Sequence, residues 1–121
     1  MKPLSLTLKN FGPYINETID FTKFEDSSLF LISGKTGSGK TTIFDGMSYA
    51  LFGESSGKLR LGKEMRSTFA DPSEATEVTL LFKHNEFLYE LNRLPEQELF
   101  KKRGTGVRKQ SAKISLKIGR A

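Results

Sequence analysis

The most distinctive group of polar and charged residues in this sequence lies in a short glycine-rich stretch. Residues 34–41 read Gly-Lys-Thr-Gly-Ser-Gly-Lys-Thr, which matches the phosphate-loop pattern G-x-x-x-x-G-K-[ST] at every fixed position. Glycine recurs because backbone N–H groups must approach a polyphosphate closely, and because some positions need a positive φ. A helix that begins near Gly39 would point its positive end at the same oxygens. The pattern therefore predicts a nucleotide-phosphate site.

Charge and geometry assign the roles within this loop. Lys40 would place an ammonium group against the β- and γ-phosphates and is the candidate catalytic residue, and the Thr41 hydroxyl can ligate Mg²⁺. Thr42 lies one helical step further on, near the expected α-phosphate. The candidate binding residues are Gly34, Lys35, Thr36, Gly37, Ser38, Gly39, Lys40, Thr41 and Thr42.

Hydrolysis requires more than this loop. A phosphoryl-transfer site also needs an acidic residue on a second strand to hold Mg²⁺, and a group that positions water. Such an acid usually follows a short apolar strand, but here the apolar residues 29–32 run into Ser33 and residues 78–82 run into Lys83. We therefore expect half of an active site.

Two elements must position the loop. Residues 29–32 are apolar throughout, which is typical of a central strand covered on both faces. From Thr41 onward the pattern becomes helical, and Gly53 is a candidate C-cap. The apolar positions of this helix are Ile43, Met47, Ala50 and Leu51.

Other segments alternate apolar and polar residues, which predicts strands near 4–8, 15–21, 78–82, 87–91 and 114–118. The first two should pair as antiparallel neighbours, and the third and fourth should form a hairpin around residues 83–86. Residues 54–76 should be mostly loop, with a short helical turn near 63–69, and 101–109 should be a mobile basic loop. Most of the ten Phe residues should pack in the core.

Composition narrows the class of protein. The 121 residues suit one domain over 1–121, and the absence of Cys excludes disulfides and thiolate zinc sites. The single His84, in a predicted turn, should be a solvated side chain. No apolar run approaches the roughly 18 residues that span a bilayer, and the N-terminus shows no secretory leader, so we expect no membrane partner and a cytoplasmic location.

The net charge of +5 is unevenly distributed. Residues 1–100 hold 11 Lys and Arg against 14 Asp and Glu, a net of −3, whereas residues 101–121 hold eight basic residues and no acid, a net of +8. Such a basic segment could follow DNA phosphates. It could equally be a solvated hairpin whose charge offsets acids elsewhere.

Several short motifs together resemble the SbcC family, the large coiled-coil ATPase subunits of bacterial SbcCD nucleases, which are related to SMC proteins. They are Lys-Asn-Phe-Gly-Pro-Tyr at 9–14, the phosphate loop, Ile-Phe-Asp-Gly-Met at 43–47 and Ala-Leu-Phe-Gly at 50–53. Residues 65–67, 76–78, 93–95 and 101–104 are also similar to the family's later strands and basic hairpin. The resemblance covers nearly the whole chain.

The resemblance implies an α/β fold: the N-terminal lobe of an ABC/SMC-type ATPase head, with the phosphate-loop strand and helix beside an antiparallel sheet. It implies ATP and Mg²⁺ as cofactors, bound by residues 34–42 with Thr41 at the metal. It also implies a Q-loop, a signature motif and a Mg²⁺-site acid beyond this segment. The implied partners are the nuclease subunit SbcD, a second head that dimerises on ATP, and double-stranded DNA.

Two other interpretations stay open. The segment could be a lobe of another ABC- or RecF-like ATPase. It could also be a nucleotide-binding module that has no turnover on its own.

Overall fold

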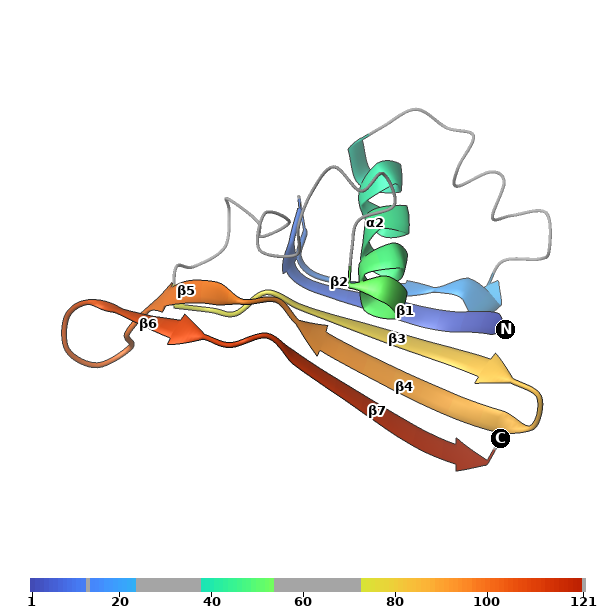
Figure 1. Ribbon diagram of the computed structural model, residues 1–121. Coiled ribbons are helices and arrows are strands. Elements are labelled where there is room, and N and C mark those ends of the chain that lie inside the picture. Colours follow the sequence, from blue (N-terminus) through green and yellow to red (C-terminus); the bar gives the residue numbers. More distant parts are fainter. Residues whose placement is uncertain (13, 24–37, 54–72, 121) are drawn as a thin grey trace.

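A computed structural model describes residues 1–12, 14–23, 38–53 and 73–120, with seven strands, one α-helix and a 3-10 turn (Figure 1). The elements are β1 (Lys2–Phe11), β2 (Tyr14–Asp20), η1 (Phe21–Lys23), α2 (Ser38–Phe52), β3 (Glu77–His84), β4 (Phe87–Leu94), β5 (Gln97–Phe100), β6 (Val107–Gln110) and β7 (Lys113–Arg120). The strand predicted at 29–32, and the helical turn predicted near 63–69, lie outside the described residues.

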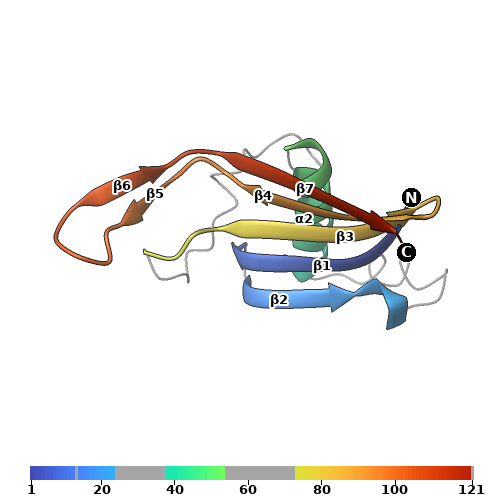
Figure 2. The ribbon, with the colours of Figure 1, turned by 90° about the horizontal axis from the view of Figure 1, so that it is seen from below.

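Five strands form one antiparallel sheet in the order β2-β1-β3-β4-β7 (Figures 1 and 2). β1 is paired on both edges, so Leu6 lies between Ile19 of β2 and Leu80 of β3. The five predicted strands are confirmed, as are the antiparallel pairing of the first two and the hairpin. The hairpin turn is tighter than predicted, because Lys83 and His84 still belong to β3.

Residues with positive φ close the two tight turns. Asn10 (φ 52°) is the second-last residue of β1, Gly12 (φ 56°) lies between β1 and β2, and Asn85 (φ 57°) lies between β3 and β4. A two-residue connection between β3 and β4 needs left-handed backbone, which Asn tolerates better than most residues. His84 is exposed beside this second turn, as predicted.

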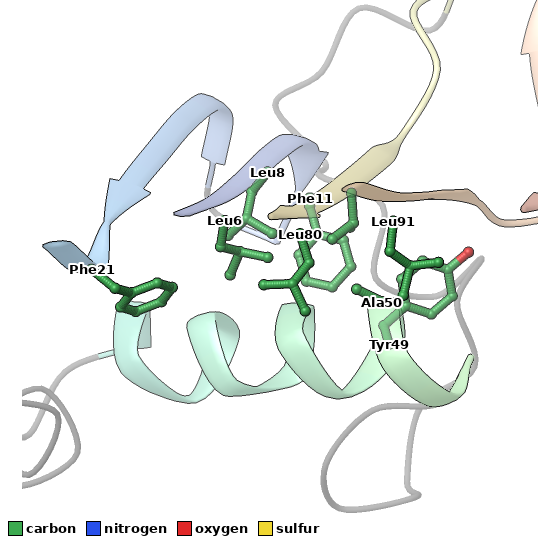
Figure 3. Packing of buried hydrophobic residues seen from close by; sticks show 9 residues of the cluster. Leu6, Leu8, Phe11, Phe21, Tyr49, Ala50, Leu80 and Leu91 are labelled. Carbon is green, nitrogen blue, oxygen red and sulfur yellow. The ribbon is translucent and has the colours of Figure 1, made fainter. Parts of the chain in front are cut away.

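α2 crosses one face of the sheet and covers its core (Figure 3). Leu6, Leu8 and Leu80 are fully buried beneath it, and each such burial contributes about 1.5–3 kcal/mol. The helix approaches closely because Gly46 has no side chain: a Cβ atom there would lie 2.6 Å from Leu8 Cδ2. The predicted apolar face of the helix is confirmed, since Ala50 is buried and Ile43, Met47 and Leu51 pack against the core.

The same sheet face continues onto β7 without this cover. Leu116 pairs with Leu91 of β4, yet Leu91 is 7% exposed and Leu116 is 52% exposed. Ile114 and Ile118 are 60% and 59% exposed. α2 packs on β1, β3 and β4, so the apolar stripe of β7 lies beyond the helix.

The prediction of a mobile basic loop over 101–109 is wrong for its last three residues, 107–109, which belong to β6. β5 and β6 pair as a two-stranded antiparallel sheet that extends past one end of the main sheet (Figures 1 and 2). The sequence showed no clear alternation here because Arg108 and Lys109 occupy strand positions. Residues 107–110 form a strand because they pair with β5, and residues 101–106 connect the two strands.

The expectation that most Phe residues pack in the core is only partly confirmed. Of the six whose side chains are described, Phe11 and Phe21 are buried and Phe82 packs against the core. Three are exposed: Phe52 at 74%, Phe87 at 38% and Phe100 at 58%. Phe52 and Phe100 lie at the ends of α2 and β5.

Candidate phosphate-binding site

The predicted phosphate loop runs into the first turn of α2. The helix begins at Ser38, so the backbone of residues 38–42 is helical. Residues 34–37 lie outside the described residues, and so do the side chains of 38–42. The expected sequence of loop and helix is therefore observed for its second half, and the contacts of Lys40 and Thr41 stay predictions.

The amino end of α2 suits an external anion. The first N–H groups of a helix lack partners within the helix and carry a partial positive charge. An Asp or Glu in the first turn often compensates this charge, but the first turn of α2 contains no acidic residue. No acidic side chain of the first turn neutralises the partial positive charge at this end of the helix. That charge would therefore attract a polyphosphate.

The carboxyl end of α2 is held by a residue from β4. Arg93 Nε donates a hydrogen bond to the Ala50 carbonyl oxygen at 3.2 Å, and its guanidinium lies 5.8 Å from the centre of the Tyr49 ring. The last turn of α2 has no basic residue of its own, so Arg93 supplies the cation that this end favours. Gly53 ends the helix with φ 78°, and its N–H donates to the Tyr49 carbonyl at 2.7 Å, which confirms the predicted cap.

Tyr49 is buried at this same end of the helix (Figure 3). Burial raises the pKa of the Tyr49 hydroxyl to about 12, and the positive charge of Arg93 opposes part of that rise. Phe11 packs against the ring with centroids 6.2 Å apart. The helix that carries the phosphate loop is thus attached to β1 and β4 at its far end.

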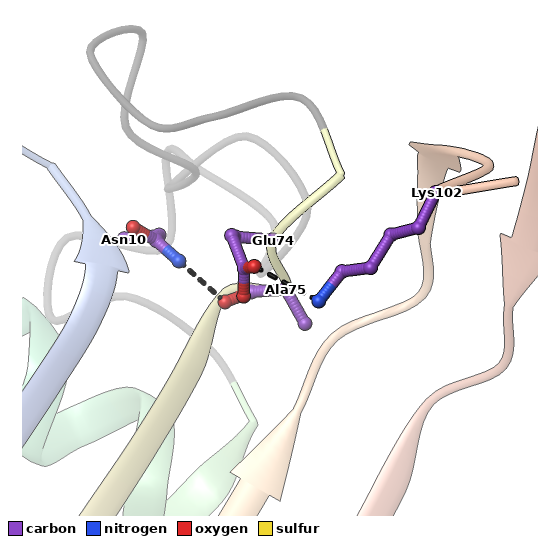
Figure 4. A network of polar contacts seen from close by, with 4 residues as sticks. All are labelled: Asn10, Glu74, Ala75 and Lys102. Carbon is purple, nitrogen blue, oxygen red and sulfur yellow. Dashed lines mark hydrogen bonds and ion pairs between the residues drawn. The ribbon is translucent and has the colours of Figure 1, made fainter.

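A buried polar network joins the main sheet to the β5–β6 hairpin. Gln97 of β5 accepts a hydrogen bond from the Thr76 N–H at 2.8 Å and donates to the Thr76 carbonyl at 3.1 Å. Thr76 Oγ1 donates to the Asn10 carbonyl at 2.8 Å. Figure 4 shows the next bond, in which Asn10 Nδ2 donates to the Ala75 carbonyl at 2.8 Å. Unpaired polar groups would be costly at this depth, so the network orients the hairpin.

Ion pairs on the surface add to this attachment. Lys102 Nζ lies 3.0 Å from Glu74 Oε1, and Lys109 Nζ lies 2.9 Å from Glu96 Oε1 (Figure 4 shows the first). The Glu96 carboxylate raises the pKa of the Lys109 ammonium. All four side chains are about half exposed or more, so each pair adds little stability.

Sequence reasoning missed Arg93, Thr76 and Gln97. Arg93 occupies an ordinary strand position, and nothing near it in the sequence marks it as the cap of a helix about 40 residues earlier. Gln97 is a polar residue in a four-residue strand, without a periodic signal. Of the residues in the polar network, only Asn10 could be recognised from its local sequence. An Asn two residues before Gly12 favours a turn with positive φ.

Other kinds of site find no support in the described part of the chain. Its His, Asp and Glu side chains do not gather in threes in a way that could hold a metal ion. Among the described helices, none has the length and apolar character to cross a membrane.

Comparison with known proteins shows the domain family to which this chain belongs. A family model described as an AAA domain matches residues 5–120, and the chain belongs to this family. The curated relatives are then more specific, and three of them are named as the C subunit of the nuclease SbcCD. That of Lactococcus lactis is 50% identical over 118 residues, which are 96% of this chain and 11% of the relative.

The other two relatives agree. The Vibrio cholerae protein is 47% identical over 117 residues, 96% of this chain and 12% of the relative. The Staphylococcus aureus (strain JH9) protein is 54% identical over 93 residues, 77% of this chain and 9% of the relative. The resemblance to SbcC is thereby confirmed, and the chain spans about a tenth of the length of the curated relatives it matches.

Proposed function

We propose that this chain forms the ATP-binding half-site of an SbcC-like ATPase, which acts with the nuclease subunit SbcD in processing DNA double-strand breaks and hairpins. The observation that carries the proposal is the phosphate-loop pattern of residues 34–41 running into α2, whose first turn contains no acid. The AAA domain match and the similarity to SbcC proteins support it. We place the protein in the cytoplasm.

Each part of the loop has its own proposed role in binding the nucleotide. Backbone N–H groups from Gly34 to Thr42 would surround the phosphates, Lys40 would neutralise charge on the β- and γ-oxygens, and the Thr41 hydroxyl would hold Mg²⁺. A bound metal ion would supply further charge neutralisation at these oxygens. The acid that completes the metal site belongs to another part of the protein, and a second head closes over the nucleotide.

A second interpretation is that the segment binds nucleotide but has no turnover by itself. The end of β3 favours it, because that strand runs into Lys83 and His84 rather than into an acid. The two interpretations are compatible. The first describes the complete protein and the second describes this segment.

Double-stranded DNA is the proposed macromolecular partner, and the basic hairpin is its proposed binding surface. Lys101, Lys102 and Arg103 stand at the exposed end of the hairpin, and residues 101–120 contain no acid. Each phosphate that a cation neutralises makes binding more sensitive to salt.

Hydrolysis by the full-length protein with SbcD tests the half-site. We expect Lys40→Ala to reduce ATP hydrolysis to background, because it removes the ammonium group proposed to neutralise charge on the β- and γ-phosphates. Lys83→Ala is the matched control, since Lys83 is exposed at the far end of β3. Full activity of Lys40→Ala would contradict the assignment of the site.

The salt dependence of DNA binding tests the proposed surface. Changing Lys101, Lys102 and Arg103 to Ala should lower the slope of log affinity against log salt by about 0.9 for each phosphate that is no longer neutralised. An unchanged slope would mean that these residues do not contact DNA phosphates. That result would not contradict the proposed ATP site.

A further inference from the structure

The connecting end of the β5–β6 hairpin carries an exposed apolar pair. Phe100 and Val107 lie directly opposite each other as the last pair of the β5–β6 ladder. They are 58% and 49% exposed, whereas Leu99, on the other face of the same strand, is fully buried. The hairpin therefore has one face that packs and one that presents an aromatic ring to solvent.

Backbone geometry holds this pair at a defined place. The Lys101 N–H donates to the Gly106 carbonyl at 3.1 Å, which closes the connection directly after Phe100. Gly104 (φ 82°) and Gly106 (φ 100°) supply the left-handed backbone that the turn needs. At the other end of β5, Gln97 is fixed in the buried network with Thr76. The pair is thus the last pair of strand residues before the turn of an anchored hairpin. This hairpin extends past one end of the main sheet (Figures 1 and 2).

Cations adjoin the apolar pair along the chain, although Arg108 pairs with Leu99 and so lies on the opposite face of the hairpin. Lys101, Lys102 and Arg103 follow Phe100 directly, and Arg108 follows Val107. Lys102 pairs with Glu74, and Arg108 Nη1 donates to Gln110 Oε1 at 3.2 Å. Within the described residues, Lys101 and Arg103 form no salt bridge, so they keep their charge available for an external anion.

An exposed aromatic ring with cations directly next to it in the sequence fits one kind of ligand: a polyanion that also offers flat apolar faces. Single-stranded DNA and the frayed end of a duplex have this chemistry, because their bases are unstacked and their phosphates are close by. The interior of a duplex does not offer it, since its base faces are stacked on one another.

We propose that the hairpin end binds exposed DNA bases, with Phe100 stacking on a base, Val107 supporting the ring, and Lys101 and Arg103 on the flanking phosphates. This rests on the proposed function, because it takes DNA as the partner. It adds that the hairpin distinguishes DNA with exposed bases from closed duplex. Phe100 gives the interaction its preference for such DNA, and the cations give it general affinity.

Binding by the full-length protein in complex with SbcD tests the proposal. We expect Phe100→Ala to weaken binding to a duplex with a single-stranded overhang by about 5- to 100-fold, the effect of removing one base–aromatic stack. The slope of log affinity against log salt should not change, because no charge is removed. Binding to closed circular duplex should stay at the wild-type level.

Matched variants separate stacking from other effects. Phe100→Tyr keeps an aromatic ring and should bind as the wild type does. Phe52→Ala removes another exposed Phe, at the end of α2, and should also leave binding unchanged. A 2-aminopurine base in the overhang should be quenched by the wild type and by Phe100→Tyr, but not by Phe100→Ala.

Three results would overturn the proposal. The first is wild-type binding of the overhang by Phe100→Ala. The second is an equal loss on closed circular DNA, which would mean that exposed bases are not the ligand. The third is Phe100-dependent binding to vesicles of phosphatidylserine and phosphatidylcholine, which would make an anionic lipid surface the partner. An unchanged salt slope for the triple variant of Lys101, Lys102 and Arg103 would instead count against the proposed role of those cations in DNA binding.

Discussion

One face of the sheet has two halves that the amino-acid pattern does not distinguish. On β1 and β3 the inward residues Leu6, Leu8 and Leu80 are fully buried under α2. On β7 the equivalent apolar residues Ile114, Leu116 and Ile118 are more than half exposed. Both halves alternate apolar and polar residues, so the difference lies in what covers them.

This difference shows where the stability of the described structure resides. Apolar area contributes to folding only when it is removed from water. We therefore expect substitutions beneath α2 to be costly and the same substitutions on β7 to cost little. Four variants of this chain test that gradient, and their expected costs in stability decrease from Leu80→Ala to Leu116→Ala.

Leu80→Ala should have the largest effect. Leu80 is fully buried on β3 between Leu6 and Leu91. Removing its side chain leaves a cavity under α2, and we expect a loss of about 2–5 kcal/mol in the free energy of unfolding. Urea denaturation followed by circular dichroism measures it. A loss below that of Leu116→Ala would contradict the account of the core.

Gly46→Val should come next, because a Cβ at Gly46 would lie 2.6 Å from Leu8 Cδ2 in a closely packed region. Overpacking of this kind costs about 1–3 kcal/mol. The matched control is Gly119→Val on β7, where no other group comes within 4 Å of the new Cβ. If both variants unfold at the same urea concentration, α2 does not pack on β1 as closely as described.

Tyr49 should make stability depend on alkaline pH. Its pKa is about 12 in the folded chain and about 10 when unfolded, so the unfolded state releases the proton first. Stability is therefore unaffected below pH 10 and falls between pH 10 and 12, by at most about 1.4 kcal/mol per pH unit. Urea denaturation at about pH 9, 10 and 11 measures the decline, and Tyr49→Phe should show a shallower one. Equal declines would mean that burial does not hold this hydroxyl neutral.

Leu116→Ala should have the smallest effect. Leu116 is 52% exposed, so its truncation removes little area that folding had buried. We expect the free energy of unfolding to fall by less than about 1 kcal/mol in the same urea experiment. A loss as large as that of Leu80→Ala would show that β7 is covered as well as β3 is.

The sequence predicted the positions of the strands better than it predicted which of them the helix covers. Alternation located the strands that contain Leu8, Leu80 and Leu116, because side chains on a strand face opposite sides at every second residue. It did not predict that α2 leaves β7 uncovered. The position of a helix across a sheet depends on long-range contacts, such as the hydrogen bond from Arg93 to the Ala50 carbonyl oxygen. β5 and β6 were missed because they are short and contain charged residues within the strands.

The candidate site shows the same division. Local spacing predicts a phosphate site at residues 34–42, because a phosphate loop has fixed positions within about eight residues. The polar network of Asn10, Thr76 and Gln97 joins residues far apart in the sequence, and no local pattern could identify it. The exposure of Phe100 was also unforeseen, because an aromatic residue is more often buried.

Calorimetric titration of MgATP into this chain is the most direct test of the central claim, that residues 34–42 form an ATP-binding half-site. We expect weak binding by the wild type and by Lys83→Ala, no binding by Lys40→Ala, and phosphate release at background for all three. Unchanged binding by Lys40→Ala, or robust ATP turnover by the 121-residue chain alone, would contradict it.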